Sequence, residues 1–340
     1  MKNTSLKYFT INILRKIINF PKIFSKKTSY GPDYSDKYFY IIGFPRNEDG
    51  LLFIVLCNLS HICYSIKKGY IPVIDQQNFE DQYKTSNEFL PKNSWEIYFN
   101  QPFGYKLDDI KNSKNIILSN KLQMPNKYFT IDFDIFMDVQ KLTYFKEMFK
   151  KSIIFNKKTM DYLISSYNTI FNTKTNILGI LCRGTDYLLK KPGGHPIQPE
   201  PHDVIIKADE ILIKYNCNYI YLATEDQDIL EMFQSRFGDK LITNNQRRFS
   251  KKDFLKYNYI SQIVKTDDNE KYNLGLNYLS TIYNLSKCDY FIGGKTAGSI
   301  GVYLMSNNFI FDYIWELGYY PLPSIFTMIK QKLNKIFNNE

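Results

Sequence analysis

Arginine is scarce in this sequence, although the net charge is +10. Lysine and arginine together number 44, yet the only arginines are Arg15, Arg46, Arg183, Arg236, Arg247 and Arg248. Lysine therefore carries most of the positive charge. An arginine kept at the end of a strand indicates a need for the planar, two-pronged donor that lysine cannot supply.

Cysteine is also rare, and its spacing shows no pairs. The five cysteines are scattered and form no C-x-x-C pair: Cys57, Cys63, Cys182, Cys217 and Cys288. This pattern argues against a disulfide framework and against a zinc site. It predicts reduced, mostly buried thiols in a cytoplasmic protein.

The sequence lacks an apolar run long enough to cross a membrane. Residues 1–30 are basic and amphipathic, with no small-residue cleavage site after them. They are expected either to lie on an acidic membrane surface as an interfacial helix or to pack on the body of the protein. A second basic helix is expected at 322–340.

Nucleic-acid modules are missing as well. There is no zinc-finger spacing, no RNP-like aromatic strand and no lysine tract. The positive net charge therefore points to other anions, namely nucleotides, phosphates or anionic lipid surfaces.

What the sequence does contain is a regular alternation of strand and helix patterns over 340 residues, enough for two domains. Strands are expected at 38–44, 70–75, 115–119, 177–182, 219–223, 241–243, 290–292 and 309–311. Helices are expected at 51–68, 139–172, 201–215, 227–236, 272–285 and from 300. This order predicts an α/β fold of mostly parallel, doubly wound sheets, divided into 31–172 and 173–321. His61, on the first helix, is expected to be a hydrogen-bonded core residue.

The strand at 177–182 ends in Arg183, followed by Gly184, Thr185 and Asp186. Ligands of open α/β sheets bind beyond the carboxyl ends of the strands, and an unpaired arginine there requires an anion. The alternative is a structural ion pair between Arg183 and Asp186. A Gly/Pro-rich loop with His195 is expected to follow, up to Gln198.

Two further strand ends carry polar residues. Thr224, Glu225 and Asp226 follow the strand at 219–223, where their side chains either contact a ribose or base edge or cap the next helix. The run Gly293–Gly301 fails the P-loop pattern because position 289 is Asp289. Glycines and small hydroxyl residues before a helix nevertheless predict an anion site, the alternative being a tight turn.

Asp132-Phe133-Asp134 has the D-x-D form of a metal-binding triplet. Such triplets are common, and this one is far in sequence from the anion loops, so no metal site is predicted.

The three segments Cys182–Tyr187 (CRGTDY), Tyr221–Asp226 (YLATED) and Ser286–Leu304 resemble the C-terminal motifs of the fucosyltransferase superfamily, over about residues 176–305. A weaker resemblance covers Gly43–Gly50, where relatives carry a Gly/Asn-rich first turn. The resemblance implies two facing Rossmann-like domains (the GT-B arrangement), GDP-fucose in the C-terminal domain, no metal cofactor, and inversion at the anomeric carbon.

Carried over by position, Arg183 would grip the β-phosphate and the leaving oxygen. The donor would also be contacted by Gly184, Thr185, Thr224, Glu225, Asp226, Gly294, Lys295, Thr296, Ala297, Gly298 and Ser299. Acceptor-side residues would be Arg46, Asn47 and Trp95. One departure from the family pattern is Gly184, which stands where relatives carry a second arginine.

The candidate groups for proton transfer from an acceptor hydroxyl are Glu48, Asp49, Asp186 and His195. Glu48 and Asp49 are alternatively helix caps, and His195 is alternatively a loop hydrogen-bonding residue. The resemblance implies a glycosyltransferase of bacterial surface polysaccharide synthesis, with a glycan or lipid-linked glycan as acceptor. It is expected to act in the cytoplasm or on the inner face of the membrane. The alternatives are a glycosyltransferase that uses another nucleotide-sugar and a non-catalytic nucleotide-binding protein.

Overall fold

The computed structural model describes residues 26–45, 49–119, 124–125, 128–250, 252–253 and 268–322, without the side chains of Thr185, Asp186 and Asp268. The proposed helix at 322–340 and most of the N-terminal segment lie outside these ranges, as do Arg46, Asn47 and Glu48.

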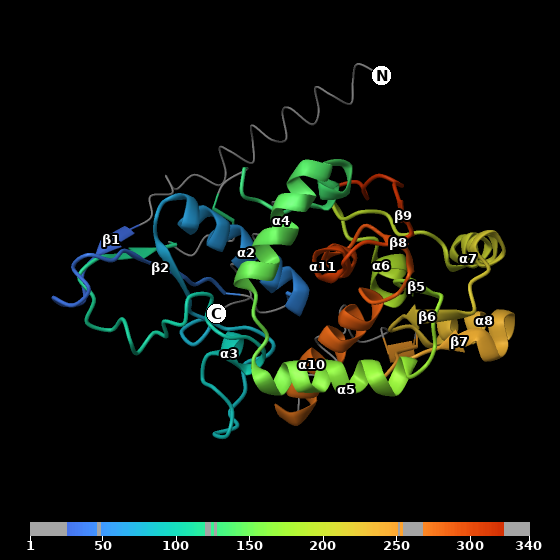
Figure 1. The fold of residues 1–340 in the computed structure, drawn as a ribbon, viewed down its shortest axis with the longest axis horizontal. Helices are drawn as coiled ribbons and strands as arrows, with labels where there is room; N and C mark the ends of the chain where they lie inside the picture. The colour runs from blue at the N-terminus through green and yellow to red at the C-terminus, as the bar shows by residue number, and fades with distance from the viewer. Residues whose placement is uncertain are drawn as a thin grey trace, which may run out of the picture.

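The described chain forms two separate sheets (Figure 1). The first has the strand order β1-β4-β2-β3 and the second has the order β7-β6-β5-β8-β9. All strand pairs are parallel except β1 with β4. The α/β class with mostly parallel sheets is thus confirmed.

The elements of the first half are β1 (Lys26–Thr28), β2 (Phe39–Ile42), α2 (Leu51–Lys67), β3 (Ile71–Ile74), α3 (Ser94–Tyr98), β4 (Ile116–Leu118), the 3-10 helix η1 (Phe133–Met137), α4 (Val139–Ser152) and α5 (Lys157–Phe171). Those of the second half are β5 (Ile177–Leu181), α6 (Thr185–Lys190), α7 (Pro201–Tyr215), β6 (Tyr219–Ala223), α8 (Gln227–Phe237), the 3-10 turn η2 (Gly238–Lys240), β7 (Leu241–Ile242), α10 (Asp268–Leu285), β8 (Tyr290–Gly294), α11 (Ala297–Met305) and β9 (Phe311–Trp315).

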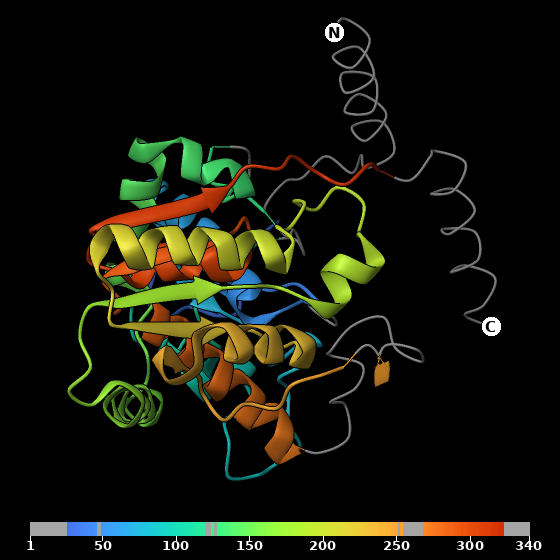
Figure 2. The same ribbon diagram turned by 90° about the vertical axis from the view of Figure 1, so that its right-hand side faces the viewer.

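The central strands are apolar on both faces, as buried parallel strands require. In β5, Ile177 and Leu181 face a core shared with the first half, whereas Leu178 and Ile180 face α7 and α8. Figure 2 shows these two helices lying over the outer face of the second sheet. The second sheet is therefore covered by helices on both sides.

One continuous core joins the inner faces of the two sheets through α2, α4, α5, α10 and α11. His61 of α2 is fully buried in it, and its Nδ1 lies 3.0 Å from Tyr40 Oη, which confirms the expected core histidine. Because this core is shared, the division at residue 172 stays a prediction about how the chain is organised.

The two halves approach each other closely where α2 and α11 meet at a glycine. A Cβ atom on Gly301 would lie 2.5 Å from Cδ1 of Leu52, which is fully buried. We expect Gly301→Val to lower the free energy of unfolding by about 1–3 kcal/mol, the usual cost of overpacking a filled core. Urea unfolding measures this change. Gly50→Ser is the matched control, because nothing lies within 4 Å of Gly50 and serine is a good residue at its helix N-cap position. Equal stabilities of the two variants would contradict the prediction.

Three sequence-based expectations need correction. Residues 185–190 of the expected loop instead form α6, and the loop with His195 follows that helix. Helix α11 begins at Ala297 and not at 300, since Thr296 caps it by accepting a hydrogen bond from Ser299 N. The last strand lies at Phe311–Trp315, two residues beyond the expected start. For α11 the Thr296 cap sets the start, and for β9 the pairing with β8 sets it.

Candidate functional site

Four charged side chains follow the strands of the second sheet in a single row. The last common row of paired residues across β6, β5, β8 and β9 is Ala223, Leu181, Gly293 and Ile314. Two residues later the same strands carry, in the same order, Glu225, Arg183, Lys295 and Glu316. Since side chains alternate between faces with a period of two, this register predicts that all four lie on the face toward the first half.

The two positive charges lie in the middle of the row and the two carboxylates at its ends. Arg183 Nε lies 3.3 Å from Glu225 Oε1, and Lys295 Nζ forms an ion pair with Glu316. Neighbouring strands are about 4.8 Å apart, so the backbones of Arg183 and Lys295 lie side by side at the carboxyl edge of the sheet. The described ion pair of Arg183 is thus to Glu225, whereas Asp186 was the partner considered from sequence.

The first turn of α11 adds backbone donors to this edge. Ser299 N donates a hydrogen bond to Thr296 Oγ1 at 3.0 Å, and Ser299 Oγ donates to Gly294 O at 2.6 Å. The amides of Ala297 and Gly298 belong to the same turn, in which backbone amides have no acceptor within the helix. Together with the helix dipole, they favour an anion at this point.

Asp134 reaches this edge from the first half. Its Oδ1 accepts hydrogen bonds from Lys295 Nζ at 3.0 Å and from Tyr319 Oη at 2.5 Å. Sequence distance was therefore a poor guide, because η1 packs against α11 and brings the D-x-D segment to the anion loop. Asp132 instead caps η1 and pairs with Lys141. In the described ranges, no three His, Cys, Asp or Glu side chains are grouped so as to hold a metal ion.

At the end of β6, the capping alternative is observed for Asp226. Its Oδ1 accepts a hydrogen bond from Ile229 N at 3.1 Å, and its side chain is 4% exposed. Glu225 Oε1 accepts a hydrogen bond from Gly184 N at 3.1 Å and so ties the β5 and β6 ends together. The donor contacts of Thr224, Glu225 and Asp226 stay predictions.

Gly184 is required by this close contact. A Cβ atom there would lie 2.4–2.7 Å from three atoms of the Asp226 side chain. We expect Gly184→Ala to lower the free energy of unfolding by about 1–3 kcal/mol, because it displaces the residue that caps α8. Differential scanning calorimetry would show this as a lower Tm, whereas an unchanged Tm would mean that Asp226 can turn away at no cost. The second arginine of the superfamily pattern would not fit here.

His195 is placed near Arg183 by α6. Its Nδ1 lies 3.3 Å from Tyr187 Oη, and the Tyr187 ring lies 4.8 Å below the Arg183 guanidinium. The structure thus brings Arg183 and His195 together, with one aromatic ring between them.

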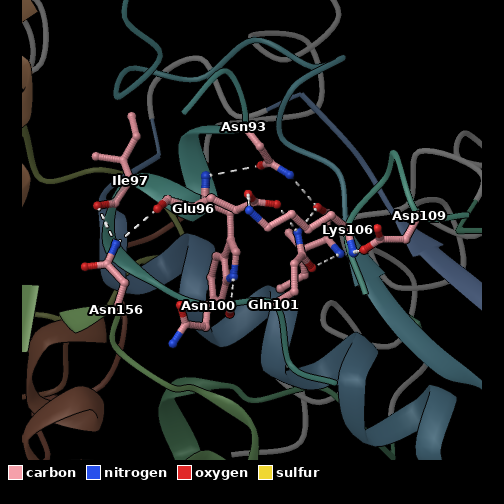
Figure 3. Close-up of polar contacts among 10 residues, drawn as sticks. Asn93, Glu96, Ile97, Asn100, Gln101, Lys106, Asp109 and Asn156 are labelled. Carbon is pink, nitrogen blue, oxygen red and sulfur yellow. Dashed lines mark hydrogen bonds and ion pairs between the residues drawn. The ribbon is translucent and has the colours of Figure 1, made fainter. Parts of the chain in front are cut away.

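The acceptor-side candidates are less well supported. Trp95 is 3% exposed and stacks on Phe99 with ring centroids 4.4 Å apart, so it has a packing role. Figure 3 shows the polar contacts of this segment, in which Asn93 and Gln101 hold α3 to the end of β3 through Ile74. The side chain of Asp49 is half-buried, beside the N-cap Gly50 of α2.

Residues that sequence reasoning missed come mainly from helices. Tyr278 of α10 is one of them, because its Oη lies 3.2 Å from the Cβ position of Gly298. Burial raises the pKa of Tyr278 to about 12, although nearby Arg183 acts in the opposite direction. Only the packing of α10 on α11 places it there. Glu316 was missed as well, and it aligns with Lys295 only once the register of β9 with β8 is known.

No protein-family model matches the chain, and no curated protein matches it in sequence. Its fold is similar to several solved structures. The fucosyltransferase NodZ from Bradyrhizobium is 14% identical, covers 79% of this chain and 94% of its own, and has a TM-score of 0.45. A mutant of FUT1 from Arabidopsis thaliana, in complex with GDP, is 11% identical, with coverage of 84% and 72% and a TM-score of 0.46. POFUT1 in complex with GDP-fucose is 7% identical, with coverage of 83% and 74% and a TM-score of 0.36. All three TM-scores are below 0.5, so the function proposed next depends on the site itself.

Proposed function

We propose that this protein is a metal-independent, inverting glycosyltransferase that transfers fucose from GDP-fucose to a glycan acceptor in bacterial surface polysaccharide synthesis. The observation that carries the proposal is that two basic residues, Arg183 and Lys295, follow neighbouring strands beside the N-terminus of α11. The Arg183 guanidinium and the first-turn amides of α11 are donors that suit the oxygens of a nucleoside diphosphate. The motif resemblance is the reason for naming fucose as the sugar and guanine as the nucleobase.

In the proposed reaction, the largest change in charge occurs on the leaving group. The bond between the sugar's anomeric carbon and the diphosphate oxygen breaks, and the acceptor oxygen bonds to that carbon from the opposite face. Negative charge grows on the departing diphosphate, and fixed donors aimed at that charge are the strongest catalytic contribution such a site offers. Arg183 and the first turn of α11 are the proposed donors.

The proton of the acceptor hydroxyl must pass to a base. Of the candidates, His195 lies within the described site, next to Tyr187 and in ring contact with Phe133 of the first half, 6.4 Å between centroids. Asp49, Asp186 and Glu48 remain proposed alternatives. We propose His195 as the first to test.

Ligand binding in the presence of EDTA tests the proposal. Purified protein is titrated with GDP, GDP-fucose, UDP, CDP and ADP by calorimetry and thermal shift. A ligand at 100 times its Kd raises the stability by about 2.7 kcal/mol. GDP binding together with release of fucose from GDP-fucose supports the proposal. Stronger binding of another nucleotide would replace the donor, and binding without turnover would favour a non-catalytic nucleotide-binding protein.

The acceptor and the place of action are tested separately. None of the helices in the described part of the chain combines the length and hydropathy that a membrane crossing requires. We propose a cytoplasmic protein in peripheral contact with the acidic inner membrane surface through its basic segment 1–30. Sedimentation with anionic and with neutral vesicles, with and without residues 1–25, measures that contact.

A further inference from the structure

Tyr187 is the residue that connects the proposed diphosphate donor to the proposed base. The Arg183 guanidinium lies 4.8 Å from the Tyr187 ring centroid, while Arg183 Nε lies 3.3 Å from Glu225 Oε1. The guanidinium is thus held on two sides, by a ring and by a carboxylate. An arginine restrained in this way keeps its orientation when the charge of the ligand changes.

The same side chain contacts His195 through its hydroxyl group. Tyr187 Oη lies 3.3 Å from His195 Nδ1, and the two rings meet edge to face with centroids 5.7 Å apart. The backbone around His195 is fixed from another direction, because Tyr320 N donates to His195 O at 2.9 Å and Gly194 N donates to Tyr320 O at 2.9 Å. The backbone is therefore held by Tyr320, and the imidazole ring by Tyr187.

The loop that carries His195 is also tied to the anion edge. Gln198 is 3% exposed, and its Nε2 donates to Lys295 O and to Pro196 O, both at 3.1 Å. The sequence predicted it only as a Gly/Pro-rich loop. In the structure it connects α6 to α7, and through Gln198 it contacts Lys295, just after β8.

We propose that Tyr187 is a positioning residue that holds the Arg183 guanidinium and the His195 imidazole in one fixed arrangement for transfer. This inference rests on the proposed function. Its physical reason is that donors and bases lose efficiency when they are displaced by about 1 Å from the reacting atoms. The ring of Tyr187 serves Arg183, and its hydroxyl serves His195, so the two contacts can be separated by substitution.

Tyr187→Phe and Tyr187→Leu make that separation. Phenylalanine keeps the ring beneath Arg183 but removes the hydroxyl, so we expect kcat to fall about tenfold with the KM for GDP-fucose unchanged. Leucine removes both contacts, so the KM for GDP-fucose should also rise, by about three- to thirtyfold. If Tyr187 had a purely structural role, both variants would have a lower thermal stability. The Tyr187→Phe variant would then not lower kcat while leaving KM unchanged.

Histidine NMR gives a readout that needs no substrate. The chain has only three histidines, so the imidazole signals can be assigned by single substitutions of His61 and His202. In Tyr187→Phe we expect the His195 signals alone to shift. The matched control is Tyr313, whose ring lies 4.9 Å from Lys207 Nζ on the α7 side of the sheet. Tyr313→Phe and Tyr313→Leu should leave both the kinetics and the His195 signals unchanged.

The outcomes are distinguishable. A wild-type kcat and unmoved His195 signals in Tyr187→Phe would overturn the inference while leaving the proposed function intact. Identical kinetics of the two Tyr187 variants would show that the Tyr187 ring does not position the Arg183 guanidinium. If the wild-type protein binds no nucleoside diphosphate, the proposed function fails and the role of Tyr187 in transfer fails with it. The NMR result then reports only whether the contact with His195 exists in solution.

Discussion

Replacing Arg183 by alanine is expected to lower the rate of sugar transfer by about 10²- to 10³-fold, the loss seen when a preorganised donor to a developing negative charge is removed. Arg183 follows the central strand β5, and its guanidinium is oriented by Glu225 and Tyr187. The group is therefore fixed before the ligand binds, which is the condition under which such donors act most strongly. Steady-state kinetics with GDP-fucose, together with GDP titration, measure both the rate and the affinity.

Arg183→Lys separates charge from geometry. Lysine keeps the positive charge but lacks the planar fork, so we expect an activity between those of the wild type and Arg183→Ala. The matched control is Arg236→Lys, which changes the same residue type in an ion pair with Asp209 between α7 and α8. The control should retain full activity. Wild-type activity in Arg183→Ala, in a variant with a wild-type Tm, would remove the basis of the proposed function.

The second large effect concerns Lys295, whose side chain is 2% exposed and lies between Asp134 and Glu316. Removing both carboxylates with Asp134→Asn and Glu316→Gln leaves a buried ammonium without a counterion. Breaking a buried ion pair in this way typically costs about 3–5 kcal/mol. The side chains of Asp134 and Glu316 are 62% and 49% exposed, so water can partly replace them, and we expect about 3 kcal/mol.

Lys295→Met provides the contrast to the double variant. Methionine removes the buried charge and leaves two carboxylates that can be solvated, so stability should change little. Donor affinity should nevertheless fall, because one of the two basic residues of the proposed diphosphate site is gone. If Lys295→Met is as unstable as the double variant, then packing, not charge, explains the effect.

The pH dependence of the double variant follows from the same contacts. Partial burial alone would raise the pKa of Asp134, but hydrogen bonds from Tyr319 and Lys295 outweigh it and lower that pKa below 3.8. Burial alone would lower the pKa of Lys295, but Glu316 and Asp134 raise it above 10.5. The contribution of the Asp134 carboxylate to stability is therefore lost only as the pH falls below 3.8, and that of the Lys295 ammonium only as the pH rises above 10.5. The stability difference between wild type and double variant should stay constant from about pH 5 to 9. A difference that changes within this window would show that other groups carry it.

Sequence alone determined the fold class and most elements of this protein. Strands such as β5 and β6 are short apolar runs followed at once by polar residues, and this pattern is local, so it can be read without a structure. The same holds for Arg183 and the α11 start as candidate anion-binding positions. Strands that alternate with helices predict parallel sheets, because each helix supplies the crossover connection that parallel strands need.

Only the tertiary structure decided which residues share the site. Asp134 and Lys295 are 161 positions apart in the chain, yet their side chains are 3.0 Å apart. Tyr278 reaches Gly298 because α10 packs against α11. Such contacts depend on how the faces of helices and sheets pack in three dimensions, and no local pattern of residues encodes that packing. Strand register is the intermediate case, since it aligned Arg183, Lys295 and their two carboxylates once the strand order was known.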